Sequence, residues 1–365
     1  MSAQRTYLEP SALLAFGRDL FELNGLTTAD AQIVMEGLIA ANLRGIDSHG
    51  VSRIPMYLNR LRRGVVNPRP NIVVEDVAGA VAAVDGDDGM GFLVGRRAMS
   101  KAVELAERSG IGLVGARRST HYGMGALYVQ QAIEAGYIGF AWTNASPAIP
   151  VWGGRTALLG ASPFAAGVPG NLNKPYVLDM AMTVIARGKI RLSALHGEPI
   201  PEGLALDAEG RPTTDAQKAF EGVCLPFGGV KGAALAMLMD LMAGVLTGAN
   251  YGGQVKSLYF DHSAPQNVGH VFIAVRRDLF MPAAQFDTRM NDFVDRVKAS
   301  PRASGFDEIL MPGEPEERTA AARARTGIPI SADVARELRA EGERAGIEWP
   351  GGTDTPLDLD ASFEI

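Results

Sequence analysis

The chain has 365 residues, of which 47% are hydrophobic and 21% are charged, and its formal net charge is −6. This is the composition of a folded globular protein, and it excludes a disordered chain and a collagen-like one. The length exceeds the size at which a single core stops growing, so we expect two or three structural units. A mildly acidic chain attracts neither phosphate backbones nor anionic lipid, so we expect no nucleic-acid partner and no membrane partner.

Two features bear on the compartment. The single cysteine, Cys224, allows no intrachain disulfide, and the polar first residues do not resemble a secretory signal, so a cytoplasmic location is predicted. Residues 232–249 are almost entirely apolar, with one charged residue, Asp240, near the middle. Because a charge at mid-membrane is costly and Ala and Gly suit close packing, we interpret this run as a buried core helix and not a membrane span.

The first 70 residues predict helices. Apolar spacing indicates one helix at 11–23, which Asn24-Gly25 stops, and a second that ends near Gly45. Thr27 or Thr28 offers a side-chain oxygen to cap the start of this second helix. A third helix is predicted at 52–63, before Gly64.

From residue 71 the pattern changes to alternating strands and helices, which is typical of an α/β layer. The predicted strands are 71–75, 80–85, 111–116, 137–142, 164–168, 176–179 and 268–275, and the predicted helices are 92–108, 126–135, 183–195, 283–299 and 332–344. Residues 144–160 are rich in Pro and Gly and predict a long ordered loop, a feature that is usually functional. Ser331 is expected to cap the last helix.

One complete GxGxxG pattern occurs, formed by Gly110, Gly112 and Gly115. A dinucleotide fingerprint needs a strand before the glycines and a helix after them. Here a helix precedes and a strand follows, so we interpret the pattern as a helix end followed by a buried strand. The sequence also lacks the GxSxG, HExxH and CxxC patterns, so neither a serine nucleophile nor a metal site is predicted.

The most suggestive cluster lies in residues 44–57, RGIDSHGVSRIPMY, at a break between helices. If the chain turns helical at residue 52, Arg53 and Tyr57 share a face near His49. Guanidinium is the natural partner of a substrate carboxylate, and a neighbouring histidine can move a proton near neutral pH. A capped helix start with surface arginines remains the alternative for this stretch.

Three further positions invite a function. His121 follows the strand 111–116, at the kind of strand end where α/β sheets hold ligands, although a lone histidine there is more often structural. Asp179 ends a strand, and the amides of the helix predicted after it could hold a phosphate. Lys231 offers a cation at the start of the apolar helix, although a helix-flanking lysine is an equally good interpretation.

Taken together, these segments resemble the malate/L-lactate dehydrogenase type 2 family, also described as sulfolactate dehydrogenase-like NAD(P)-dependent oxidoreductases. The resemblance extends from about residue 13 to residue 315. Its stretches are RGIDSHGVSRIPMY, STHYG, WGGRTALLG with SPFA, LDMAMTVIARGK, IPEGLALDAEGRPTT, PFGGVKG and MPGEPE. Several long motifs in the right order make the resemblance specific.

The resemblance implies an α/β fold of the sulfolactate dehydrogenase type, in which the dinucleotide-binding sheet is not a Rossmann arrangement. A helical domain is then built from both terminal segments. We accordingly expect an N-terminal helical segment (1–72), an NAD(P)-binding and catalytic α/β domain (73–280) and a C-terminal helical segment (281–365) that packs with the N-terminal helices. A homodimer with active sites near the subunit interface is also implied.

The resemblance assigns roles residue by residue. His49 matches the proton donor of some members, and His121 matches the proton donor of others; we place His49 first. Ser48, Arg53 and Tyr57 would line the substrate site. The cofactor would be held by Ser146, Asp179, Met180, Ala181, Lys231, Gly232, Gly313, Glu314 and Pro315. The chain departs from many members at 160–163, where it reads GASP instead of GTNP, and at Met182-Thr183 instead of Thr-Ser.

The predicted activity is therefore hydride transfer between NAD or NADP and C2 of a small 2-hydroxy or 2-oxo acid of the malate, lactate, sulfolactate or ureidoglycolate type. The alternative is an NAD(P)H-dependent reductase of cyclic imino acids, such as piperideine- or pyrroline-2-carboxylate, which some members are. A catalytically silent binding protein is the third hypothesis. The choice between NAD and NADP stays open.

Overall fold

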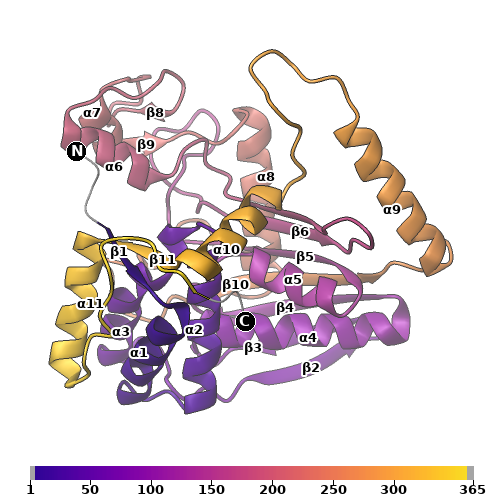
Figure 1. Cartoon of the computed structure of the whole chain (residues 1–365), viewed down its shortest axis with the longest axis horizontal. Helices are drawn as coiled ribbons and strands as arrows, with labels where there is room; N and C mark the ends of the chain where they lie inside the picture. Colours follow the sequence, from indigo (N-terminus) through magenta and orange to yellow (C-terminus); the bar gives the residue numbers. More distant parts are fainter. Residues whose placement is uncertain (1–4, 360–365) are drawn as a thin grey trace.

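The computed structural model describes residues 5–359 and is built around one seven-stranded sheet (Figure 1). The strand order is β2 (Val73–Ala78), β3 (Val81–Asp85), β4 (Ile111–Ser119), β10 (Val268–Arg276), β5 (Tyr137–Thr143), β6 (Phe164–Val168) and β7 (Tyr176–Met180). Only β3 and β4 run parallel, and every other neighbouring pair is antiparallel. The predicted α/β layer is confirmed, and its connectivity is not that of a Rossmann sheet.

Helices α4 (Gly91–Ser109) and α5 (Ala126–Glu134) cover one face of this sheet (Figure 1). Gly110 ends α4 in the left-handed conformation, with φ +83°. A Cβ on Gly112 would lie 2.1 Å from the carbonyl oxygen of Ala102, so β4 and α4 pack in direct contact. The glycine pattern is thus a helix end followed by a buried strand, as the sequence predicts.

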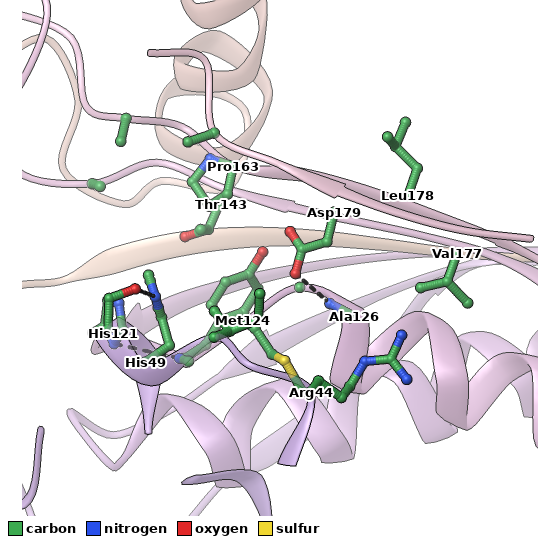
Figure 2. A pocket seen from close by; sticks show the side chains of 18 of the residues that line it. Arg44, His49, His121, Met124, Ala126, Thr143, Pro163, Val177, Leu178 and Asp179 are labelled. Atoms are coloured by element: carbon green, nitrogen blue, oxygen red, sulfur yellow. Dashed lines mark hydrogen bonds between the residues drawn. The ribbon is translucent and has the colours of Figure 1, made fainter. Parts of the chain in front are cut away.

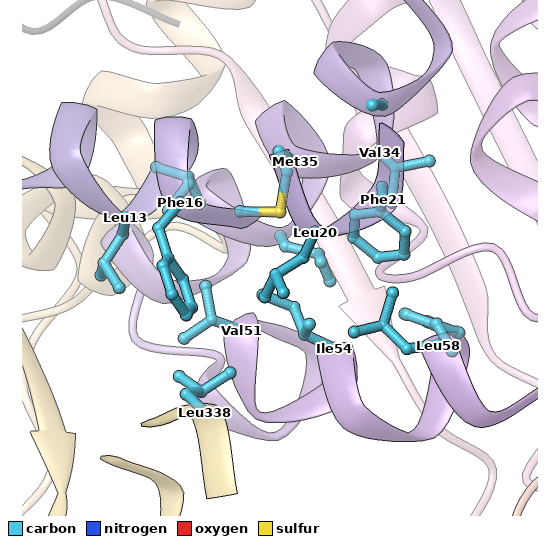
Figure 3. Close-up of a cluster of buried hydrophobic side chains, with 14 of the residues drawn as sticks. Leu13, Phe16, Leu20, Phe21, Val34, Met35, Val51, Ile54, Leu58 and Leu338 are labelled. Atoms are coloured by element: carbon cyan, nitrogen blue, oxygen red, sulfur yellow. The ribbon is translucent and has the colours of Figure 1, made fainter. Parts of the chain in front are cut away.

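A helical unit beside the sheet combines both ends of the described chain. It contains β1 (Arg5–Leu8), α1 (Pro10–Leu23), α2 (Thr28–Leu43), α3 (Ile54–Arg62), α10 (Glu314–Thr326), β11 (Ile328–Ser331) and α11 (Ala332–Ala345). β1 pairs antiparallel with β11, and Leu338 of α11 joins Leu13, Met35 and Ile54 in one buried cluster (Figure 3). The terminal segments therefore share a core. By contrast, α9 (Ala283–Lys298) lies apart from this unit (Figure 1).

The predicted helix caps are largely confirmed. The Thr27 hydroxyl accepts a hydrogen bond from the amide of Asp30 at the start of α2, and the Ser331 hydroxyl accepts one from Val334 at the start of α11. Two short 3₁₀ turns, η1 (Asp47–His49) and η2 (Val51–Arg53), precede α3, and η2 takes the place of the first residues of the predicted third helix.

A smaller unit follows β7 and contains α6 (Arg187–His196), β8 (Ala205–Leu206), α7 (Ala216–Glu221) and β9 (Val223–Cys224). The sequence places the start of α6 at residue 183, which is wrong. Thr183 instead forms a β-bridge with Pro226, so the helix begins only at Arg187.

The apolar run of residues 232–249 forms α8 (Val230–Asp240) and a π-helical turn, η3 (Leu241–Val245). The interpretation as a buried helix holds for one face only. Small residues such as Ala236 and Ala243 are buried, whereas Leu238, Leu241 and Val245 are 46%, 55% and 49% exposed. The reason is that no part of the described chain covers the outer face. Among residues 5–359, no helix is long and apolar enough to cross a membrane.

Candidate active site

A cavity of about 560 Å³ opens at one edge of the central sheet (Figure 2). The residues after β4 and β5, the residues before β6 and the end of β7 form one wall. Another wall is formed by residues of the segment from Arg44 to His49 and by residues between Leu310 and Glu316, Glu314 excepted. Figure 2 shows His49 and His121 at one end of the cavity, Arg44 and Val177 at the other, and Asp179 between them.

The neighbours of His121 keep its ring neutral and in one tautomer. The Tyr57 hydroxyl lies 2.6 Å from Nδ1 of His121, and the amide of Gly123 also points at this nitrogen, 3.4 Å away. Burial keeps the pKa of His121 well below its usual value, and the nearby His49 and Arg53 lower it further. Burial also raises the pKa of Tyr57, so its hydroxyl stays protonated and donates. Because Nδ1 accepts, the neutral ring carries its proton on Nε2.

His49 lies beside His121, with the ring centroids 5.5 Å apart and the planes 26° from parallel. Its Nδ1 is 3.0 Å from the Ser48 hydroxyl. Burial, together with the charge of Arg53, lowers the pKa of His49 to about 4, so this ring is neutral at pH 7 as well. The two rings form a stacked and uncharged pair.

Arg53 supplies the positive charge next to this pair. Its Nε donates a hydrogen bond to the carbonyl oxygen of Ser48, and its guanidinium lies over the Tyr259 ring, 5.4 Å from the centroid. A guanidinium fixed in this way has further N–H donors that can grip a carboxylate.

Asp179 lines the middle of the cavity and caps α5. Its Oδ2 accepts a hydrogen bond from the amide of Ala126, at 2.9 Å (Figure 2). The surrounding protein desolvates this carboxyl group and raises its pKa to about 6, although the hydrogen bonds from the backbone oppose the shift. The helix whose amides were expected to hold a phosphate begins only at Arg187, and none of its residues lines this cavity.

Arg44 forms the far end of the cavity wall. Its Nη1 pairs with Oε1 of Glu317 at 2.6 Å, and its side chain is 6% exposed. The second nitrogen, Nη2, is buried without a hydrogen-bond partner. A buried donor without a partner costs free energy, so an anionic ligand group that met it would bind favourably.

The structure brings many of the predicted residues to one cavity. Its wall includes Ser48, His49, His121, Ser146, Asp179, Ala181, Gly313 and Pro315. Tyr57 and Arg53 are not part of this wall but contact residues that are, Tyr57 through the His121 ring and Arg53 through the Ser48 carbonyl. The predicted cofactor residues Met180, Lys231, Gly232 and Glu314 are not part of this wall.

Each of these four residues has another environment. Met180 faces a neighbouring hollow beside Lys189, and Lys231 is exposed at the start of α8. Gly232 packs against the carbonyl oxygen of Phe227, and Glu314 accepts hydrogen bonds from Lys298 and from the amide of Met311.

Sequence reasoning gave no role to other wall residues, among them Arg44 and Tyr122, which lie in its motifs, and Thr143 and Gln266, which do not. Thr143 is the last residue of β5. The reasoning that ligands lie at strand ends, which pointed to His121, therefore applies to Thr143 as well. Arg44 stands within the RGIDSHG motif. Nothing in the local sequence marks Gln266. In the described part of the chain, no group of three or more His, Cys, Asp or Glu side chains could hold a metal ion.

Comparison with known proteins gives consistent matches over most of the chain. The family model "Malate/L-lactate dehydrogenase" matches residues 8–339. The L-sulfolactate dehydrogenase of Methanocaldococcus jannaschii is 38% identical over 322 residues, which cover 88% of this chain and 92% of that protein. The malate dehydrogenase of Pyrococcus abyssi is 36% identical over 332 residues, covering 89% and 91%.

Solved structures agree. The sulfolactate dehydrogenase of M. jannaschii superposes with a TM-score of 0.89 at 36% identity, covering 94% of this chain and 98% of that one. The expected sulfolactate dehydrogenase-like fold is thereby confirmed. A Δ1-piperideine-2-carboxylate reductase from Pseudomonas syringae is similar with a TM-score of 0.82 at 28% identity, covering 92% and 99%.

Two further relatives carry a cofactor in their names. The (2R)-3-sulfolactate dehydrogenase (NADP(+)) of Chromohalobacter salexigens is 36% identical, covering 87% of this chain and 93% of that protein. The ureidoglycolate dehydrogenase (NAD(+)) of Escherichia coli is 32% identical, covering 86% and 89%.

Proposed function

The chain belongs to the malate/L-lactate dehydrogenase family, and we propose that it catalyses reversible hydride transfer between a nicotinamide cofactor and C2 of a small 2-hydroxy or 2-oxo acid. The observation that carries this proposal concerns His121. Its ring is neutral, carries its proton on Nε2 and lies near the positive charge of Arg53. His121 can transfer a proton to or from the oxygen on C2, and Arg53 can bind the carboxylate next to C2.

In the direction of reduction, His121 gives its Nε2 proton to the oxygen on C2. Tyr57 passes its hydroxyl proton to Nδ1 of the same ring, so the imidazole stays neutral throughout. Burial is the larger influence on Tyr57 and disfavours the tyrosinate that forms, and the charge of Arg53 offsets part of that cost, so the tyrosinate lasts only until its proton is returned. Solvent returns the proton to Tyr57, and oxidation runs the same steps backwards.

This assignment favours His121 over His49 for the proton, the reverse of the order that the sequence suggested. His49 has one hydrogen bond with a side chain, that of the adjacent Ser48, and because either group can donate, this bond does not determine which ring nitrogen carries the proton. In this proposal His49 closes the cavity over the reacting atoms and excludes water from them.

The residues of the cavity suit a nicotinamide dinucleotide. In particular, the buried Nη2 of Arg44 has no hydrogen-bond partner, and a phosphate oxygen of the cofactor would provide one. Asp179 can accept hydrogen bonds from hydroxyl or amide groups of the cofactor, and Ser146 and Gly313 lie in the same wall. When bound, the cofactor supplies the hydride for reduction or accepts it in oxidation. The names of the relatives support NAD and NADP equally, so we assign a nicotinamide cofactor without choosing between the two.

A homodimer is part of the proposal. Leu238, Leu241 and Val245 form an apolar strip on the outer face of α8 and η3, and no element within residues 5–359 covers it. An exposed strip of this kind is typical of an interface, and a second copy of the chain could bury it.

The test mixes the purified protein with NADH, and separately with NADPH, against pyruvate, oxaloacetate, sulfopyruvate and ureido-substituted 2-oxo acids. Loss of reduced-nicotinamide absorbance with one of these acids is the expected result. Consumption of cofactor only with a cyclic imine, such as piperideine-2-carboxylate, would replace the dehydrogenase proposal with the reductase alternative. Cofactor binding without turnover on any compound would indicate a binding protein.

A further inference from the structure

We propose that Arg323, on α10, is a positioning residue for the turn that carries Ser48, His49 and Arg53, and that it acts through Asp47. The proposal rests on the proposed function, because its consequence is measured on the reaction. Arg323 grips both oxygens of the Asp47 carboxylate, with Nη1 2.6 Å from Oδ1 and Nη2 3.0 Å from Oδ2. Such a bidentate pair fixes direction as well as distance.

The turn needs outside support because it has little hydrogen bonding of its own. It consists of the two 3₁₀ turns η1 and η2, which are short and have poorer hydrogen-bond geometry than an α-helix. The Ser52 hydroxyl donates to the carbonyl oxygen of Asp47, and Arg53 Nε donates to that of Ser48. These bonds fix the residues of the turn to one another and do not fix the turn to the rest of the protein.

Asn42, near the end of α2, anchors the turn from the inside. Its Nδ2 donates to Oδ1 of Asp47 at 2.7 Å, and its Oδ1 accepts from the amide of Val51 at 2.8 Å. This side chain is buried, and a Cβ on Gly50 would lie only 2.1 Å from its Oδ1. Asn42 thus joins the two ends of the turn around His49. Arg323 completes the clamp, because its Nη1 donates both to Asp47 and to the carbonyl oxygen of Asn42 at the end of α2.

The same helix also contacts the cofactor end of the cavity. Gly313, in the cavity wall, immediately precedes α10, and Glu317, in its first turns, pairs with Arg44. Glu317 therefore connects α10 to the wall that holds Arg44, and Arg323 connects it to the substrate turn. Because an α-helix is rigid over this length, α10 sets the distance between the two ends of the cavity.

The experiment compares Arg323→Gln with Arg325→Gln, a matched change at an exposed position on the same helix. For Arg323→Gln we expect kcat/KM for the 2-oxo acid to fall about ten- to a hundredfold, the range for losing a hydrogen-bonded charge pair. The Kd of the cofactor, measured by calorimetry, should change less than twofold. Arg323→Lys keeps the charge without the bidentate geometry and should recover part of the loss.

Asp47→Asn completes a double-mutant cycle. If Arg323 acts through Asp47, the double variant is no worse than either single one. Equal kcat/KM values for Arg323→Gln and Arg325→Gln, or fully additive losses in the cycle, would overturn the proposal.

Hydrogen–deuterium exchange separates this proposal from the proposed function. We expect the amides of Val51 and Arg53 to exchange faster in Arg323→Gln than in Arg325→Gln, even for a protein that turns over none of the acids. Identical exchange would refute the positioning role. Inactivity of the unaltered protein on every compound would refute only the proposed function.

Discussion

The Tyr57 hydroxyl, on α3, lies 2.6 Å from Nδ1 of His121, which follows β4. This contact joins the helical unit to the central sheet at the point where the proton is expected to move. Tyr57→Phe removes the hydroxyl and keeps the ring that packs against Phe92. We expect kcat to fall about ten- to a hundredfold, and about a hundred- to ten-thousandfold in His121→Ala, which removes the proton donor itself.

Steady-state kinetics on the acid identified by the substrate panel checks this prediction. The Kd of the oxidised cofactor serves as the control, because neither change should alter it more than a few-fold. Full turnover in His121→Ala together with a large loss of turnover in His49→Ala would show that His49 is the residue that transfers the proton.

Asp179 should make cofactor binding depend on pH. Desolvation raises its pKa to about 6, so the carboxyl is mostly protonated at pH 5 and mostly ionised at pH 7. The ionised form accepts hydrogen bonds more strongly, so affinity for the oxidised cofactor should rise as the pH increases through 6. Asp179→Asn should bind more weakly at pH 7 and lose this dependence.

Calorimetric titration with the oxidised cofactor at several pH values measures the effect. An affinity that falls as the pH rises through 6 would show that the carboxylate faces a cofactor phosphate and not a donor.

His270 should make the protein sensitive to acid. It is fully buried between the hydroxyls of Ser119 and Thr143, at 2.7 Å each, and stacks on Tyr122. Burial lowers its pKa to about 3. The unfolded chain therefore takes up a proton near pH 6.5 that the folded chain refuses. The stability due to the neutral ring is complete above pH 6.5 and is lost as the pH falls towards 3.

The size of this effect is about a few kcal/mol across the whole window. Chemical denaturation at pH 7 and pH 5 should show a smaller drop in the free energy of unfolding for His270→Gln than for the unaltered protein. His196→Gln, a change at an exposed histidine, is the control and should keep the full drop. An unchanged drop in His270→Gln would assign the acid sensitivity to other groups.

Leu241→Glu should dissociate the proposed dimer. Leu241 is in the middle of the exposed strip on α8 and η3, and a buried unpaired carboxylate at an interface is costly. Light scattering after size exclusion should report a dimer for the unaltered protein and a monomer for the variant. Leu23→Glu adds the same charge at the exposed end of α1 and should stay dimeric. A monomer for the unaltered protein would refute the dimer.

Local sequence was sufficient where short-range physics decides. Thr27 and Ser331 cap helices because a side-chain oxygen near a helix start satisfies a free amide, and Gly110 ends α4 because a glycine tolerates the left-handed conformation. The SHG and STHYG motifs likewise brought His49 and His121 to attention, because few residue types move protons at neutral pH.

The rest was decided by tertiary structure. No local pattern predicts that Tyr57 orients His121 or that Arg323 holds Asp47, because each pair joins segments far apart in the chain. The same is true of Gln266 in the cavity wall and of Lys231 outside it. The prediction that the apolar run at 232–249 is fully buried was wrong for one face. Composition shows that a segment is apolar, but it does not show which part of the protein covers each face. Sequence by itself determined most of the elements and the chemical groups, although it missed α10 and the pair of β1 and β11, and folding decided which groups meet.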